Sequence, residues 1–145
     1  MRAAPALTIF AALAAVALLA PPATSKEPAK PGYPLVPLLS TAKTITGETI
    51  RYPQGAAHVT AAIVTLAPGG RTIEHRHGVP LFAYILSGTL VVDYGAQGQR
   101  TYRPGDAFME AMDVAHHGLN TGTEPVRILA VYMGAAGAKD VIPVQ

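Results

Sequence analysis

Two histidines that lie two positions apart, followed later by a pair of adjacent histidines, are the residues of this chain best suited to chemistry. Side chains two apart on a β-strand point to the same face, so His75 and His77 would share one space while Arg76 points away. Adjacent strand residues face opposite sides, so only one of His116 and His117 can face that space. Imidazole is the commonest metal ligand in proteins, so the joint pattern indicates a metal site, although a His-x-His pair taken alone is more often an ordinary exposed strand.

The elements that must position these histidines read as short strands. Runs of Val, Ile, Thr, Tyr and Phe recur along the chain, and clusters of Gly, Pro and Asp close them, which is typical of an all-β sandwich or barrel. No long segment after the N-terminal region shows the apolar stripe of a helix. The expected strands are Thr44–Tyr52, His58–Leu66, Leu81–Leu86, Thr89–Tyr94, Gln99–Tyr102, Ala107–Glu110, Ala115–Leu119 and Val126–Met133. The fifth histidine, His58, begins one of these runs with no partner nearby and is interpreted as an ordinary polar residue.

The N-terminal region predicts export. Arg2 supplies a positive start, residues 3–20 are almost entirely apolar, Pro21-Pro22 follows, and Ala23-Thr24-Ser25 offers the small residues of a cleavage site. We therefore expect a signal peptide over residues 1–25 and a secreted or periplasmic protein. The alternative is an uncleaved membrane anchor, since 18 apolar residues can just span a bilayer.

The remaining chain divides by composition into three parts. Residues 26–39 are rich in proline and predict an extended arm, residues 40–134 carry the expected strands, and residues 135–145 lose the alternation and predict a C-terminal tail. Val141, Ile142 and Val144 are the tail residues suited to packing.

Charge and cysteine content exclude several function classes. Without Arg2, the chain has ten of its 11 Lys and Arg residues and nine Asp and Glu residues. This near balance gives no electrostatic case for binding nucleic acid or, once the signal peptide is cleaved, a membrane surface. The chain has no cysteine, so an exported domain must rely on its own core and not on disulfides.

The first histidine pair lies within a regular spacing of glycines. Gly69 precedes His75 by five intervening residues, three residues separate His77 from Leu81, and six more lead to Gly88.

The third histidine lies within a second regular spacing. Gly105 is followed by five residues and then Ala111, and one residue separates Ala111 from Asp113. Two residues separate Asp113 from His116, and three more lead to Asn120.

Together the two segments resemble the paired motifs of the cupin superfamily, over about residues 40–134. Three positions depart from the pattern, because Leu81 stands where the family has a Glu, and Ala111 and Asp113 stand where it has Pro and Gly. The resemblance implies a single-domain cupin-type jelly-roll β-barrel, which closes the exposed edges of its sheets.

The resemblance also implies a ligand set. Carried over residue by residue, His75, His77 and His116 would bind one divalent metal ion inside the barrel, and His117 would face outward. Without the Glu, a neutral three-His set still binds Fe, Zn, Ni, Cu or Mn as divalent ions, in preference to Mg or Ca. Cysteine dioxygenase and the diketone-cleaving dioxygenase are cupins with three His and no Glu ligand. The implied function is therefore a three-His dioxygenase acting on a small apolar substrate, with a non-catalytic metal- or small-molecule-binding periplasmic cupin as the alternative.

Other residues complete the expected site. Glu110 can supply a fourth ligand or a carboxylate that supports a ligand histidine, with a solvated loop residue as the alternative. Glu74 should point away from the metal. The parity of the strand would turn four apolar side chains inward, which suits a small uncharged ligand. These four are Val79, Leu81, Ala83 and Ile85, and the tyrosines considered as a general base are Tyr84, Tyr102 and Tyr132. Pairing through an exposed edge near Leu35–Thr44 would make a homodimer.

Overall fold

A computed structural model of the protein describes residue 32 and residues 34–144. Within these, residues 35–144 belong to one folded unit. The expected signal peptide and half of the expected proline-rich arm lie outside the described residues, so both stay predictions.

The described chain is built of β-strands, as the sequence predicts. No α-helix occurs in residues 34–144, and one turn of 3-10 helix, η1, covers Gly95–Gln97. None of the described segments is a helix long and apolar enough to cross a membrane. The strands are β1 Ala57–Leu66, β2 His75–Arg76, β3 Leu81–Ser87, β4 Leu90–Asp93, β5 Gln99–Tyr102, β6 Ala107–Met109, β7 His117–Asn120, β8 Val126–Ala135 and β9 Ile142–Pro143.

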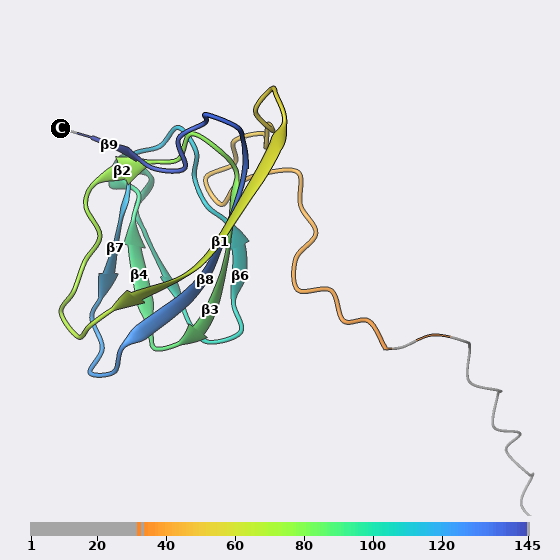
Figure 1. Ribbon diagram of the computed structural model, residues 1–145. Coiled ribbons are helices and arrows are strands. Elements are labelled where there is room, and N and C mark those ends of the chain that lie inside the picture. The colour runs from red at the N-terminus through yellow and green to blue at the C-terminus, as the bar shows by residue number, and fades with distance from the viewer. Residues whose placement is uncertain (1–31, 33, 145) are drawn as a thin grey trace, which may run out of the picture. The chain divides into compact units, whose positions relative to one another are not determined.

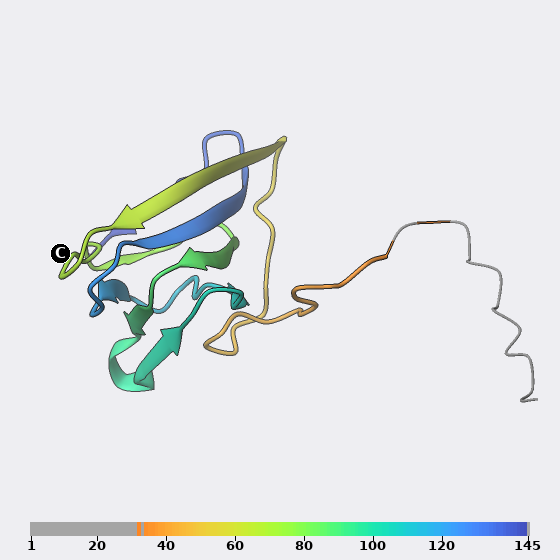
Figure 2. The ribbon, with the colours of Figure 1, turned by 90° about the horizontal axis from the view of Figure 1, so that it is seen from below.

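The strands form antiparallel sheets that enclose the core. One sheet has the order β1-β8-β3-β6, a second has the order β5-β4-β7, and β2 pairs with β9 (Figure 1). Seen from below, β1 (yellow-green) and β8 (blue) lie side by side on one side of the domain, away from η1 and β5 (Figure 2). The buried cluster includes Ala83, Ile85 and Ile128 from the first sheet and Leu90 and Val92 from the second, so the core lies between them.

Side-chain alternation on β3 follows the sequence prediction. Leu81, Ala83 and Ile85 are buried, as is Val79 just before the strand, whereas Leu86 is exposed. The register breaks only after Ile85, where β3 slips against β8. One face of β3 therefore looks into the space between the sheets.

The expected strand Thr44–Tyr52 is wrong. Apart from an isolated bridge that joins Thr49 to Lys43, none of these residues lies in a strand, and Ile45 and Thr46 form a turn. The Glu48 carboxylate accepts hydrogen bonds from the hydroxyls of Thr44 and Thr46, at 2.9 and 2.7 Å. Short polar side chains that hydrogen-bond to groups nearby in the sequence compete with strand pairing. The β-branched composition of this run predicts a strand and gives no sign of these local hydrogen bonds.

The segment expected as a tail contributes a strand. β9 pairs antiparallel with β2, placing Pro143 opposite His75 and Ile142 opposite Arg76. The edge residues expected near Leu35–Thr44 form no strand over 35–42, and β1 lies at the edge of the first sheet.

Candidate metal centre

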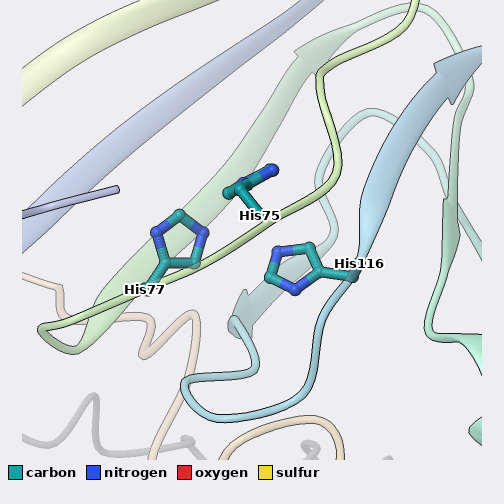
Figure 3. Close-up of side chains that lie close together, drawn as sticks. All are labelled: His75, His77 and His116. Carbon is teal, nitrogen blue, oxygen red and sulfur yellow. The ribbon is translucent and has the colours of Figure 1, made fainter. Parts of the chain in front are cut away.

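Three histidine side chains come together between the two sheets. One ring nitrogen from each of His75, His77 and His116 lies within 4.8 Å of the others, and all three residues are buried. The ring centroids are 4.9 Å apart for His75 and His77, 4.6 Å for His75 and His116, and 5.2 Å for His77 and His116. Figure 3 shows the three rings turned toward a common space.

Backbone pairing fixes the two histidine segments against each other. His75 and His116 form a bridge in which each N–H donates to the other's carbonyl, at 3.0 and 2.9 Å. The N–H of His77 donates to the carbonyl of Met112 at 3.1 Å. The spacing of two between His75 and His77 then puts both rings on the inner face, and Arg76 is exposed.

Each imidazole is held in one tautomer by a backbone carbonyl. The Nδ1 atoms of His75 and His116 donate to the carbonyls two residues upstream, Ile73 at 2.8 Å and Val114 at 2.9 Å. The Nδ1 of His77 donates to the carbonyl of Asp140 at 2.9 Å. A carbonyl only accepts, so Nδ1 carries the proton and Nε2 keeps a free lone pair.

Burial keeps these rings neutral. Desolvation lowers the pKa of His75 and His116 below the ordinary value, and it lowers the pKa of His77 to about 3. All three are therefore unprotonated near pH 7, which is the state that a metal ligand requires.

Among the described residues, Glu110 is the one buried carboxylate beside the histidines. Its Oε1 accepts hydrogen bonds from the Tyr94 hydroxyl at 2.7 Å and the Ala111 N–H at 2.8 Å, while Oε2 lies 3.9 Å from Nε2 of His116. The Tyr94 hydroxyl also contacts that of Tyr102 at 3.1 Å. Desolvation raises the pKa of Glu110 to about 7. Glu110 is thus no solvated loop residue, although it lies outside the 4.8 Å histidine cluster.

Glu110 and Leu81 are neighbours across two strands. The N–H of Glu110 donates to the carbonyl of Leu81 at 2.9 Å, continuing the register that pairs Phe82 with Met109. Residues directly opposite on an antiparallel pair share a face, so both side chains look into the same space. The carboxylate absent at position 81 therefore has a counterpart one strand away.

A mostly apolar cavity of about 90 Å³ adjoins the histidines. Apart from the three histidines and Glu110, its polar lining side chains are Thr72 and Tyr132. The other lining residues are Val64, Leu81, Ala83, Leu90, Val92, Phe108, Gly118, Ile128 and Ala130. No Lys, Arg or Asp from the described chain lines this cavity.

The remaining residues singled out in the sequence lie elsewhere. Glu74 and His117 face away from the cavity and pair with each other, with Nδ1 of His117 2.6 Å from Oε2 of Glu74. His58 is exposed at the start of β1. Tyr132 lines the cavity, Tyr102 reaches Glu110 only through Tyr94, and Tyr84 is not a lining residue.

Three contributions were missing from the sequence prediction. The sequence predicts Tyr94 only as the end of a strand and Asp140 only as part of the tail, and Thr72 lies outside the expected strands. A hydroxyl that orients a carboxylate and a carbonyl that orients a histidine have no local sequence signature, because both are long-range contacts.

The donor set fits a divalent transition metal. Three neutral imidazoles suit Zn(II), Fe(II), Ni(II), Cu(II) or Mn(II) better than Mg(II) or Ca(II), which prefer oxygen ligands. Each ring is braced through its Nδ1 atom, as is usual for histidines that bind a metal.

Comparison with known proteins identifies the family and the fold that this chain resembles. A family model for the cupin domain matches residues 62–132. Among solved structures, a polyketide cyclase from Streptomyces resistomycificus is 23% identical with a TM-score of 0.53, over 68% of this chain and 69% of that one. At that identity the likeness shows the fold alone. The sequence matches no curated protein.

Two further solved structures are longer than this chain. An oxalate decarboxylase from Lactobacillus farciminis, in a formate complex, is 27% identical with a TM-score of 0.50, over 59% of this chain and 26% of that one. An oxalate oxidase is 22% identical with a TM-score of 0.51, over 59% of this chain and 46% of that one. The chain thus spans less than half the length of either protein.

Proposed function

The chain belongs to the cupin superfamily, and on that premise we propose that it is an exported cupin that binds one divalent transition metal through His75, His77 and His116. The observation that carries the proposal is the bracing of all three rings. Each Nδ1 donates to a backbone carbonyl, so three Nε2 lone pairs are left for one ion.

We further propose a three-His dioxygenase that acts on a small apolar substrate. The metal supplies the redox centre for dioxygen, and the apolar walls beside it exclude water and orient the substrate. The cavity of about 90 Å³ is smaller than the roughly 150 Å³ that holds benzene in an engineered protein, so the substrate is small or enters only in part. Within the cavity, Glu110 and Tyr132 are the side chains that can hold or move a proton.

Metal analysis of histidine variants tests the site. Purified wild type should carry about one equivalent of a transition metal, and alanine at His75, His77 or His116 should each remove most of it. Alanine at His58 or His117 should leave the content unchanged, because these rings lie outside the cavity. Loss of metal in His117→Ala with retention in His116→Ala would contradict the ligand set.

A non-catalytic binding protein is the second candidate. One oxygen of Glu110 is already engaged by Tyr94 and Ala111, which is the arrangement of a fixed structural carboxylate. Oxygen uptake by the iron-loaded protein with a panel of small apolar and aromatic compounds separates the two. Uptake that His77→Ala abolishes supports the dioxygenase, whereas compounds that raise the melting temperature without any uptake support the binding protein.

A further inference from the structure

Residues 139–144, here called the strap, lie against the first histidine segment. The Val144 N–H donates to the carbonyl of Glu74 at 3.0 Å, and β9 pairs with β2 across His75 and Arg76. The strap carbonyl of Asp140 accepts the Nδ1 proton of His77 at 2.9 Å. These contacts bracket the whole His75–His77 segment.

His77 depends on the strap in a way that the other two histidines do not. The rings of His75 and His116 are braced by carbonyls two residues upstream in their own segments, whereas the brace of His77 comes from 63 residues away. If the strap leaves, His75 and His116 keep their braces, whereas His77 loses the one hydrogen-bond partner that its Nδ1 has among the described residues.

Few contacts hold the strap against the domain, so it can open easily. Val141 and Ile142 are 37% and 41% exposed, and β2 and β9 contain two residues each. Segments with little buried apolar surface and short hydrogen-bonded ladders are the first to open locally. The docked strap is therefore a low-stability part of a well-packed domain.

Gly78 provides the room in which the strap docks. A Cβ added there would lie 2.4 Å from the carbonyl oxygen of Lys139 and 3.2 Å from Cδ1 of Ile142. Gly78 has no positive φ, so an alanine is strained at this position only by the strap.

We propose that the strap is a positioning element of the metal site, which sets the tautomer and orientation of His77 through the Asp140 carbonyl. The inference rests on the proposed metal-binding function and adds that the site is complete only when the strap is docked. Because coupling is reciprocal, a metal bound at His77 must also hold the strap in place.

Two full-length variants undock the strap from different sides. Gly78→Ala adds a methyl group against Lys139, and Val144→Pro removes the N–H that donates to Glu74. Gly122→Ala is the matched control, because its added Cβ meets only the Asn120 side chain, at an ordinary 3.5 Å. Far-UV circular dichroism checks that each variant folds.

Two measurements report on the strap itself. Long-range proton–nitrogen spectra of the metal-free protein should show His77 as the Nδ1–H tautomer in wild type and control, and a shift to the other tautomer in both undocking variants. Trypsin cleavage after the exposed Lys139 should be slowed by Zn(II) about fivefold or more in wild type, and little in the variants.

Metal affinity completes the test. Competition titration with Zn(II) should give a tenfold to hundredfold weaker affinity in Gly78→Ala and Val144→Pro, the range expected on losing a brace behind a ligand. The double variant should be no weaker than the worse single one, because both changes act by the same undocking. Unchanged Zn(II) affinity and an unchanged His77 tautomer in both variants would overturn the inference. Failure of wild type to bind any metal would instead overturn the proposed function.

Discussion

Leu81 and Glu110 show how one residue can depart from a family pattern while the site keeps a carboxyl group. Leu81 occupies the position at which the cupin pattern has a Glu, and it lines the cavity as that ligand would. Glu110 faces the same space from the opposite strand position, fixed by Tyr94. A sheet permits this exchange, because cross-strand neighbours present their side chains to one volume.

We expect Leu81→Glu to restore a carboxylate within reach of the metal. A negative charge beside a dication in an apolar pocket should strengthen Mn(II) binding, and it should cost stability when no metal is present. Metal should then stabilise the variant more than wild type by mass action on the folded state. Melting temperatures with and without Mn(II) measure both effects.

The matched background for this test is Glu110→Gln. If the two carboxylates serve the same ion, Glu110→Gln alone should weaken Mn(II) binding, and Leu81→Glu should recover it in that background. Equal Mn(II)-induced shifts in wild type and Leu81→Glu would show that residue 81 does not face the metal.

The pKa shifts of His77 and Glu110 predict opposite pH dependences for the metal-free protein. The pKa of His77 is lowered from 6.5 to about 3, so between these values the unfolded chain binds a proton that the folded chain does not. Its contribution to the free energy of unfolding is present above pH 6.5 and falls as pH falls, by up to about 1.4 kcal/mol per pH unit. The pKa of Glu110 is raised from 4.5 to about 7, so its contribution grows as pH falls from 7 to 4.5.

Urea denaturation at pH 7 and pH 5 separates these two terms. Glu110→Gln should lose more stability than wild type over this range, because it lacks the opposing term. His77→Ala should lose less. Identical losses in all three proteins would mean that neither group is buried in the charge state described above.

At the scale of elements, two glycines of the cupin pattern share a backbone conformation but differ in their surroundings. Gly69 and Gly88 have φ of +74° and +75°. A Cβ at Gly69 would meet nothing within 4 Å, whereas one at Gly88 would lie 2.8 Å from the carbonyl oxygen of Pro125 and the Cα of Val126. Gly88 thus permits both the turn between β3 and β4 and the close approach of β8.

Alanine at these positions separates strain from crowding. Gly69→Ala should lower the free energy of unfolding by about 1 kcal/mol, the cost of a left-handed alanine. Gly88→Ala should cost about 1–3 kcal/mol more, because backbone atoms must also move. If urea denaturation gives equal losses of unfolding free energy for the two variants, the Cβ at position 88 is not crowded by the backbone of β8.

The elements that the sequence predicts well are those with local signals. Seven of the eight expected strands overlap strands of the structure, since alternation and turn residues are written into each run. The strand predicted over Thr44–Tyr52 is absent because the hydroxyls of Thr44 and Thr46 donate hydrogen bonds to the Glu48 carboxylate within the segment. β9 was absent from the expectation because a two-residue strand has no periodicity, and its pairing with β2 is a long-range event.

The site divides in the same way. The convergence of His75, His77 and His116 follows from strand parity together with the family resemblance, and the structure brings all three together. The braces behind them come from backbone carbonyls, which every residue possesses, so residue type says nothing about them.

At the scale of the whole molecule, the expected processing of the N-terminal region concerns residues outside those described. The order of a positive start, an apolar stretch and small residues before Lys26 predicts cleavage near that residue. The folded unit begins at Leu35, and Thr41 is the first of the described residues to form a side-chain hydrogen bond. We therefore expect protein recovered from the exported fraction to begin near Lys26 and to be soluble. Its melting temperature should equal that of a chain expressed directly from Lys26, because the strands and their core lie beyond the cleavage point. Intact mass spectrometry gives the start of the chain, and retention of residues 1–20 in a membrane fraction would identify an anchor instead.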